Sequence, residues 1–234
     1  MRITILRSLL MIAALGAFFP ATAADDDVQR LVAAMLGDTP VVDDLHELTD
    51  TIGGRVTGSD ANRKAVAWAA RKLQQVEVTV TTEDFEMPAV WQEKFVTVAI
   101  SGDASFDVSA VAKPFSVSAD ALNAPLLDGG AGSAEDFAHL GEAANGAWVL
   151  VETPVLNDDI GLGGLFGLYS NSRTVETNAT SAGAAGVVTM SPYPKNLVYR
   201  QFASSGANND LPLLLMERED AQRAMRLLRS GQEL

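Results

Sequence analysis

The chain has 234 residues, of which 47% are apolar, and a formal net charge of −13. This composition is typical of a packed globular protein and argues against overall disorder. Because so negative a protein repels nucleic acid and anionic membranes, we expect neither as a partner. There are no cysteines, which excludes disulfide bonds and a cysteine nucleophile. The length allows one large domain or two smaller ones.

The first 23 residues have the pattern of a secretory signal peptide. Arg2 and Arg7 flank the start of an apolar stretch, and Ala21-Thr22-Ala23 supplies a cleavage site of small residues. About 12 apolar residues are too few for a membrane span, which needs about 20. Cleavage after Ala23 removes two arginines and takes the net charge from −13 to −15. We therefore predict an exported protein, periplasmic or secreted, without membrane contact after cleavage.

Apolar residues at helical spacing predict two helices before residue 52. The first follows Asp25-Asp26-Asp27, whose carboxylates suit a helix start; a calcium site is the alternative. The second covers residues 41–51 and contains His46. We interpret His46 as a surface histidine, in preference to a metal ligand.

A glycine-rich turn precedes a third predicted helix, which extends to Gln75. The turn includes Gly54 and Gly58, to which we assign a structural role in the backbone. Ser59 or Asp60 can then cap the helix. Alternating or continuous apolar residues further predict strands over residues 76–80 and 95–100.

The second half of the chain has the alternation of strands and helices that is typical of an α/β unit. Apolar runs predict strands at Trp148–Val151, at Val187-Val188 and at Leu213–Met216, and charge order predicts a last helix over Glu217–Ser230. Its centre is the stretch Ser181–Met190. There Gly183 can take the left-handed conformation that ends a helix, and Gly186 leads into a buried strand.

Loops are predicted between these elements. Gly129-Gly130-Ala131-Gly132 indicates a turn, and Asp158-Asp159 a solvated turn. The stretch Gly161–Gly167 is apolar and rich in glycine, and we predict a loop that is either packed or serves as a lid or contact surface. A long loop is expected over Ser191–Asn209.

The amino-terminal segment resembles a known family. It combines Gly53-Gly54-Arg55-Val56-Thr57-Gly58-Ser59, a helix with Ala65-Val66-Ala67-Trp68-Ala69, the pattern Glu83-x-Phe85 and a tryptophan. These features resemble the start of the zinc-dependent exopeptidases of peptidase family M28, which include secreted aminopeptidases and carboxypeptidase Q. In that family a protease-associated (PA) domain is often inserted shortly after this segment.

The second half is similar to such a PA domain in the order of its motifs. Asp136-Phe137 and Gly146–Val151 match its first strand, residues 178–188 its helix–glycine–strand core, and residues 211–214 and 217–231 its end. After the signal peptide over 1–23, the resemblance implies an incomplete amino-terminal segment of an α/β/α peptidase domain over 24–113. It implies a PA domain, β-rich with flanking helices, over 114–234.

The chemistry of the family does not carry over to this chain. Those enzymes hold two zinc ions with histidines, aspartates and a glutamate, and a further glutamate is the general base. This chain has only His46 and His139, and neither stands in the family's His-x-Asp pattern. We therefore assign no catalytic or metal-binding residue and expect no cofactor here, with two zinc ions in the full-length family member. We expect a truncated peptidase, inactive by itself; an in-frame stop after codon 234 without peptidase-like sequence beyond it would count against this.

Two functions remain open. The first is the amino-terminal part of a secreted zinc exopeptidase, either an aminopeptidase or a carboxypeptidase, whose PA domain is a substrate-access lid for peptides. Tyr193 and Arg200 in the loop Ser191–Asn209 are then the candidate substrate-access residues. The alternative is a secreted, non-catalytic PA domain that binds peptides or proteins.

Overall fold

The computed structural model describes residues 23–156, 161–200 and 203–234, and its fold is α/β, as predicted. The chain divides into two compact units, one up to Asp84 and the other over Phe85–Leu234. Nearly all of the predicted signal peptide, and Asp158-Asp159, lie outside the described residues. Within those ranges no helix has the length and apolar character needed to cross a membrane.

The first unit is helical. Its elements are α2 (Ala23–Leu36), α3 (Val41–His46), the π-helix η1 (Glu47–Ile52) and α4 (Asp60–Gln75). Ser59 caps α4, because its side chain accepts a hydrogen bond of 3.1 Å from the backbone N–H of Asn62. The three predicted helices are thus confirmed. The strand predicted over residues 76–80 is wrong, since these residues have no neighbouring strand to pair with.

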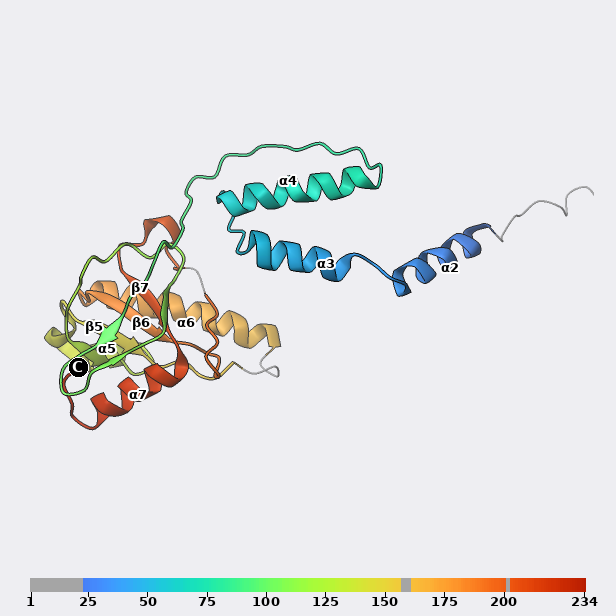
Figure 1. Ribbon diagram of the computed structural model, residues 1–234. Helices are drawn as coiled ribbons and strands as arrows, with labels where there is room; N and C mark the ends of the chain where they lie inside the picture. Colours follow the sequence, from blue (N-terminus) through green and yellow to red (C-terminus); the bar gives the residue numbers. More distant parts are fainter. Residues whose placement is uncertain (1–22, 157–160, 201–202) are drawn as a thin grey trace, which may run out of the picture. The chain divides into compact units, whose positions relative to one another are not determined.

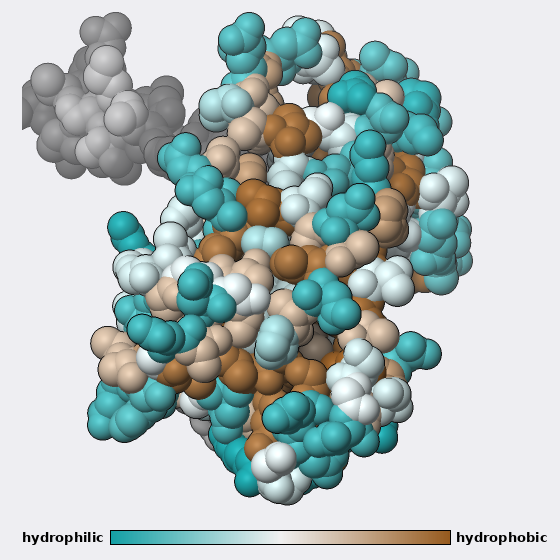
Figure 2. Space-filling view, turned by 90° about the vertical axis from the view of Figure 1, so that its left-hand side faces the viewer, coloured by the Kyte–Doolittle hydropathy of each residue, from teal (hydrophilic) through white to brown (hydrophobic). Residues whose placement is uncertain are grey.

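The helices of the first unit leave apolar side chains exposed. On α2 and α3 these are Val28, Leu31, Val32, Met35, Leu36, Val41, Val42 and Leu45. Among the unit's described residues only Ser59 is buried. Figure 2 draws the side at the left of Figure 1, which belongs to the second unit, and shows apolar areas between hydrophilic side chains there as well. The first unit therefore has amphipathic helices without a buried core of its own.

The second unit is built on a five-stranded sheet. Its strands are β3 (Ala110–Ala112), β4 (Leu126–Asp128), β5 (Trp148–Val151), β6 (Gly186–Met190) and β7 (Leu213–Met216), in the spatial order β3-β7-β6-β5-β4. β3 is antiparallel to β7, and the other neighbours are parallel. A separate antiparallel pair consists of β1 (Ala99–Ile100) and β2 (Phe106–Asp107). The three strands predicted from apolar runs in the second half are confirmed as β5, β6 and β7. Of the strand predicted over 95–100, only the last two residues form a strand, β1.

Helices cover both faces of this sheet (Figure 1). α5 (Ala134–Leu140), the 3-10 helix η2 (Gly141–Ala144) and α6 (Gly161–Ser181) belong to one face, and α7 (Arg218–Arg229) to the other; a short 3-10 helix, η4 (Gly206–Asn208), precedes β7. Because successive strand residues point to opposite faces, Val149 and Val187 pack with Val175 of α6, whereas Leu150 and Val188 pack with Met225 of α7. The unit thus has three layers and two apolar cores.

One feature differs from the sequence-based expectations. The stretch Gly161–Gly167 was predicted as a loop but begins helix α6, because the apolar face of the rest of the helix packs on the sheet and outweighs the low helix propensity of its glycines. The two compact units divide after Asp84, while the boundary at 113/114 between peptidase segment and PA domain stays a prediction. β3 pairs with β7, so the residues leading to Lys113 belong with the second unit.

Candidate functional site

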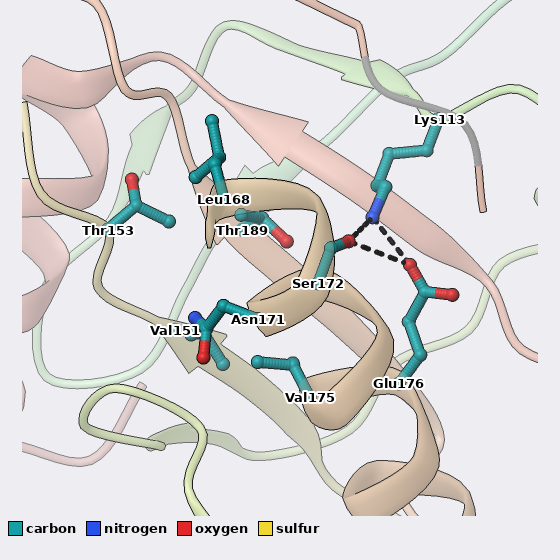
Figure 3. Close-up of a pocket in the computed structure, with 9 residues that line it drawn as sticks. All are labelled: Lys113, Val151, Thr153, Leu168, Asn171, Ser172, Val175, Glu176 and Thr189. Atoms are coloured by element: carbon teal, nitrogen blue, oxygen red, sulfur yellow. Dashed lines mark hydrogen bonds and ion pairs between the residues drawn. The ribbon is translucent and has the colours of Figure 1, made fainter. Parts of the chain in front are cut away.

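A buried ion pair lies between the sheet and α6 in the second unit (Figure 3). The Lys113 Nζ is 2.6 Å from the Glu176 Oε1, and the two side chains are only 3% and 5% exposed. Lys113 also donates to the Ser172 Oγ at 2.7 Å. The other oxygen of Glu176 accepts hydrogen bonds from the backbone N–H and the hydroxyl of Ser204, at 2.7 and 2.6 Å. Both charges therefore have partners within the protein.

The surroundings of Glu176 keep it ionised. Burial acts to raise the pKa of Glu176, but the charge of Lys113 and the hydrogen bonds from Lys113 and Ser204 outweigh it, so that the pKa lies below its ordinary value. The pair joins the end of β3, helix α6 and the segment at Ser204. It is a structural link between parts of the chain that lie far apart in sequence.

All three tyrosines of the chain lie together on the second unit, and we call this cluster the tyrosine surface. The hydroxyl oxygens of Tyr169, on α6, and Tyr199 are 3.2 Å apart. The rings of Tyr193 and Tyr199 meet edge to face, with centroids 5.9 Å apart. Tyr169 is 37% and Tyr199 39% exposed. The surface thus presents aromatic rings and hydroxyl groups to solvent.

Arg200 is held beside the tyrosine surface by an ion pair. Its Nη2 lies 2.7 Å from the Glu93 Oε1, and the other oxygen of Glu93 accepts a 2.7 Å hydrogen bond from the backbone N–H of Ala112. Tyr199 contacts Tyr193 and directly precedes Arg200, so the two predicted residues lie on the same part of the surface. The carboxylate of Glu93 neutralises the charge of Arg200. A neutralised arginine can still donate hydrogen bonds from its other nitrogens.

Nothing in this arrangement fits a pair of zinc ions. His46 is exposed on the first unit and its Nδ1 is 2.9 Å from the Asp50 Oδ2, while His139 is exposed on α5. In the described part of the chain no three His, Cys, Asp or Glu side chains could hold a metal together. A catalytic zinc site needs about three protein ligands. We therefore derive no hydrolytic step from these residues.

The glycines to which the sequence assigns structural roles differ in what surrounds them. Gly58 and Gly183 have φ of 83° and 71°, a conformation that favours glycine. A Cβ on Gly186 would come within 2.2 Å of the Trp148 ring. Gly54 has no positive φ and no atom within 4 Å of an added Cβ; its neighbour Gly53 takes the left-handed conformation, with φ of 78°.

Sequence reasoning missed several residues of this region. Lys113 and Glu176 are 63 positions apart, so no local pattern connects them. The sequence signals for a buried pair were two: Lys113 directly follows an apolar strand, and Glu176 lies on the buried face of a helix. For Tyr169 and Tyr199 a signal existed. The only tyrosines in the chain all fall between residues 169 and 199, and Tyr193 and Tyr199 lie in the long loop predicted over Ser191–Asn209.

The fold of this chain is similar to part of several solved peptidase structures. No protein-family model and no curated protein sequence matches the chain, so the comparison rests on solved structures. A peptidase M28 precursor from Shewanella amazonensis matches with a TM-score of 0.67 and 19% identity, over 89% of this chain and 49% of that one. The zinc aminopeptidase BSAP from Bacillus subtilis matches with a TM-score of 0.56 and 20% identity, over 80% and 40%.

An aminopeptidase from Aneurinibacillus sp. gives a TM-score of 0.51 at 18% identity, over 80% of this chain and 42% of that one. The chain thus spans less than half the length of each of these structures. At such identities the likeness shows a shared fold. That fold is the one implied by the sequence resemblance to family M28.

Proposed function

We propose that this chain is the amino-terminal part of a secreted zinc-dependent exopeptidase, either an aminopeptidase or a carboxypeptidase. The observation that carries the proposal is the likeness of fold to a zinc aminopeptidase, over 80% of this chain, and to a peptidase M28 precursor, over 89% of it. The exposed apolar faces of α2 and α3 also support it, because they are surfaces that the rest of a peptidase domain could cover. In this proposal the two zinc ions and the general base belong to the full-length enzyme.

The second unit is then a PA domain that acts as a substrate-access lid. The tyrosine surface supports this role, since partly exposed tyrosines offer an apolar ring and a hydrogen-bonding hydroxyl at little cost in conformational entropy. Tyr199 is central because it contacts both Tyr169 and Tyr193. We place the first contact of a peptide substrate here.

The purified chain alone is expected to hold less than stoichiometric zinc and to leave aminoacyl-anilide and carboxypeptidase substrates uncleaved. The reason is that its His and carboxylate side chains are dispersed over the described residues. Elemental analysis after dialysis against zinc, followed by an anilide assay, measures both quantities. Stoichiometric zinc together with turnover would overturn the proposal that the catalytic residues lie elsewhere in a longer enzyme.

Replacing Tyr199 with alanine should weaken binding of short peptides to the chain by about fivefold, because it removes both the ring that packs on Tyr193 and the hydroxyl that contacts Tyr169. Tyr199→Phe is the matched control, since it keeps the ring and loses only the hydroxyl. Fluorescence anisotropy with labelled tetrapeptides measures the effect. Equal binding by the alanine variant and the unchanged protein would remove the tyrosine surface from the proposed lid.

A non-catalytic PA module is the second candidate. One observation favours this candidate: the second unit has its own five-stranded sheet and two apolar cores, one on each face of that sheet. Tight binding of a defined protein or peptide ligand by the chain would support this second candidate, provided that adding the chain to a zinc peptidase does not change the rate of hydrolysis.

A further inference from the structure

A second surface feature of the second unit lies on a different side of α6 from Tyr169. It is a cavity of about 280 Å³, which we call the outer chamber, lined by Pro154, Leu156, Gly164, Gly167, Leu168 and Asn171. None of these six residues carries a charge. An uncharged, mostly apolar lining favours an uncharged, apolar occupant.

One wall of the outer chamber is held rigidly by hydrogen bonds. The backbone N–H of Leu156 donates to the Pro192 carbonyl at 2.9 Å, and the Thr153 hydroxyl donates to the Met190 carbonyl at 2.6 Å. The buried guanidinium of Arg218 donates to the carbonyls of Thr153 and Ser191, both at 3.0 Å. Because the wall is fixed in advance, an occupant would lose little affinity to ordering the protein.

A second, smaller cavity adjoins the outer chamber and contains the ion pair already described. This cavity, of about 10 Å³, shares Leu168 and Asn171 with the outer chamber and extends to Lys113 and Glu176 (Figure 3). A space of this size holds about one water molecule. The lysine and the glutamate satisfy each other and their serine partners, so they offer no free charge to a ligand.

Gly167 keeps the outer chamber open. It lies within α6, where glycine is less favourable than alanine, and an added Cβ would meet no atom within 4 Å. The space beside it is therefore free for the side chain of another molecule. Gly163, on the same helix, is also free of neighbours but does not line the chamber.

Asn171 supplies the polar group of the outer chamber. Its side-chain amide makes no hydrogen bond with any residue in the described ranges, and it points away from the Lys113–Glu176 pair (Figure 3). An amide both donates and accepts hydrogen bonds, as the backbone of a peptide does. It is thus matched to a peptide group of a molecule bound in the outer chamber.

We propose that the outer chamber binds one apolar side chain of a peptide, of the size of leucine or phenylalanine, while Asn171 bonds to the peptide backbone. The choice of a peptide rests on the proposed function; the side-chain class follows from the lining. A cavity of about 150 Å³ already accommodates benzene, and drug-sized ligands occupy about 300 Å³ or more, so the chamber suits one side chain and its flanking backbone.

The test is an NMR titration of the isotope-labelled chain with minimal peptides. N-acetyl-leucine-N-methylamide and its phenylalanine counterpart should shift the amide signals of Gly164, Gly167 and Asn171, whereas the aspartate counterpart should not. Gly167→Leu, which fills the chamber with its own side chain, should weaken binding by about tenfold or more. Gly163→Leu is the matched control and should bind as the unchanged protein does.

Each outcome decides between the two proposals. Binding by Gly167→Leu equal to that of the unchanged protein, shifts confined to the tyrosine surface, or no shift at all overturns the chamber while leaving the proposed exopeptidase origin intact. Stoichiometric zinc with turnover overturns the proposed function, whereas shifts at the chamber would still identify a peptide-binding site. Asn171→Leu should retain preference for apolar side chains but bind several-fold more weakly, by about threefold to tenfold.

Discussion

Replacing Lys113 with methionine is expected to lower the free energy of unfolding of the second unit by about 3–5 kcal/mol. The substitution leaves Glu176 buried without its counter-charge, although the Ser172 and Ser204 hydrogen bonds remain. Burial then raises the pKa of Glu176, and the carboxyl takes up a proton at a cost to the folded state. Urea denaturation followed by tryptophan fluorescence measures the loss.

Two controls isolate the pair. Lys94→Met changes an exposed lysine of the same unit and should leave the free energy of unfolding within about 0.5 kcal/mol of its original value. Replacing both Lys113 and Glu176 with apolar residues should recover most of the loss, because no unpaired charge then remains buried. A Lys113→Met variant as stable as the original would show that the pair has no such role.

The same pair makes stability depend on pH, which gives a second readout. The pKa of Glu176 in the folded state lies below the ordinary value of 4.5, so its contribution to stability is fully present above pH 4.5. The contribution is lost as the pH falls through the folded-state pKa, because the protonated carboxyl no longer attracts Lys113. Glu176→Gln should therefore flatten the acid limb of the stability curve, and an unchanged limb would contradict the assignment.

Gly186→Ala is expected to destabilise the second unit by about 1–3 kcal/mol. In β6, Gly186 pairs in register with Trp148 of β5, and an added Cβ would lie 2.2 Å from Cζ3 and 2.6 Å from Cε3 of that ring. These are atoms of a rigid ring within the sheet, so either the ring or the strand must move. Thermal or urea unfolding measures the effect.

Gly163→Ala is the matched control for this prediction. Its Cβ would meet nothing within 4 Å, and in a helix alanine is more favourable than glycine by about 0.5–1 kcal/mol, so this variant should be slightly more stable. Shortening the ring with Trp148→Leu in the Gly186→Ala background should recover part of the loss. If Gly186→Ala were as stable as the original, the contact with Trp148 would not explain why glycine stands there.

Elements whose signals are local were predictable. The apolar runs at Trp148–Val151 and Leu213–Met216 form strands β5 and β7 within the predicted bounds, and Ser59 caps α4 through its own side chain. Where the outcome depended on a partner, the predictions were wrong. Apolar residues alternate over residues 76–80 as in a strand, but no strand lies beside them to pair with. Gly161–Gly167 is helical because the remainder of α6 packs on the sheet.

The sequence by itself determined that the chain is an α/β protein, since periodicity, capping residues and glycine positions act over a few neighbouring residues. Its motifs also resemble those of family M28, and the likeness of fold to solved peptidase structures agrees with that resemblance. It also indicated that the stretch Ser181–Met190 forms the centre of the second unit. Only the tertiary structure decided which side chains meet. The Lys113–Glu176 pair, the tyrosine surface and the outer chamber join residues from helices and loops that are distant in sequence, and their encounter depends on how the layers pack rather than on any local pattern.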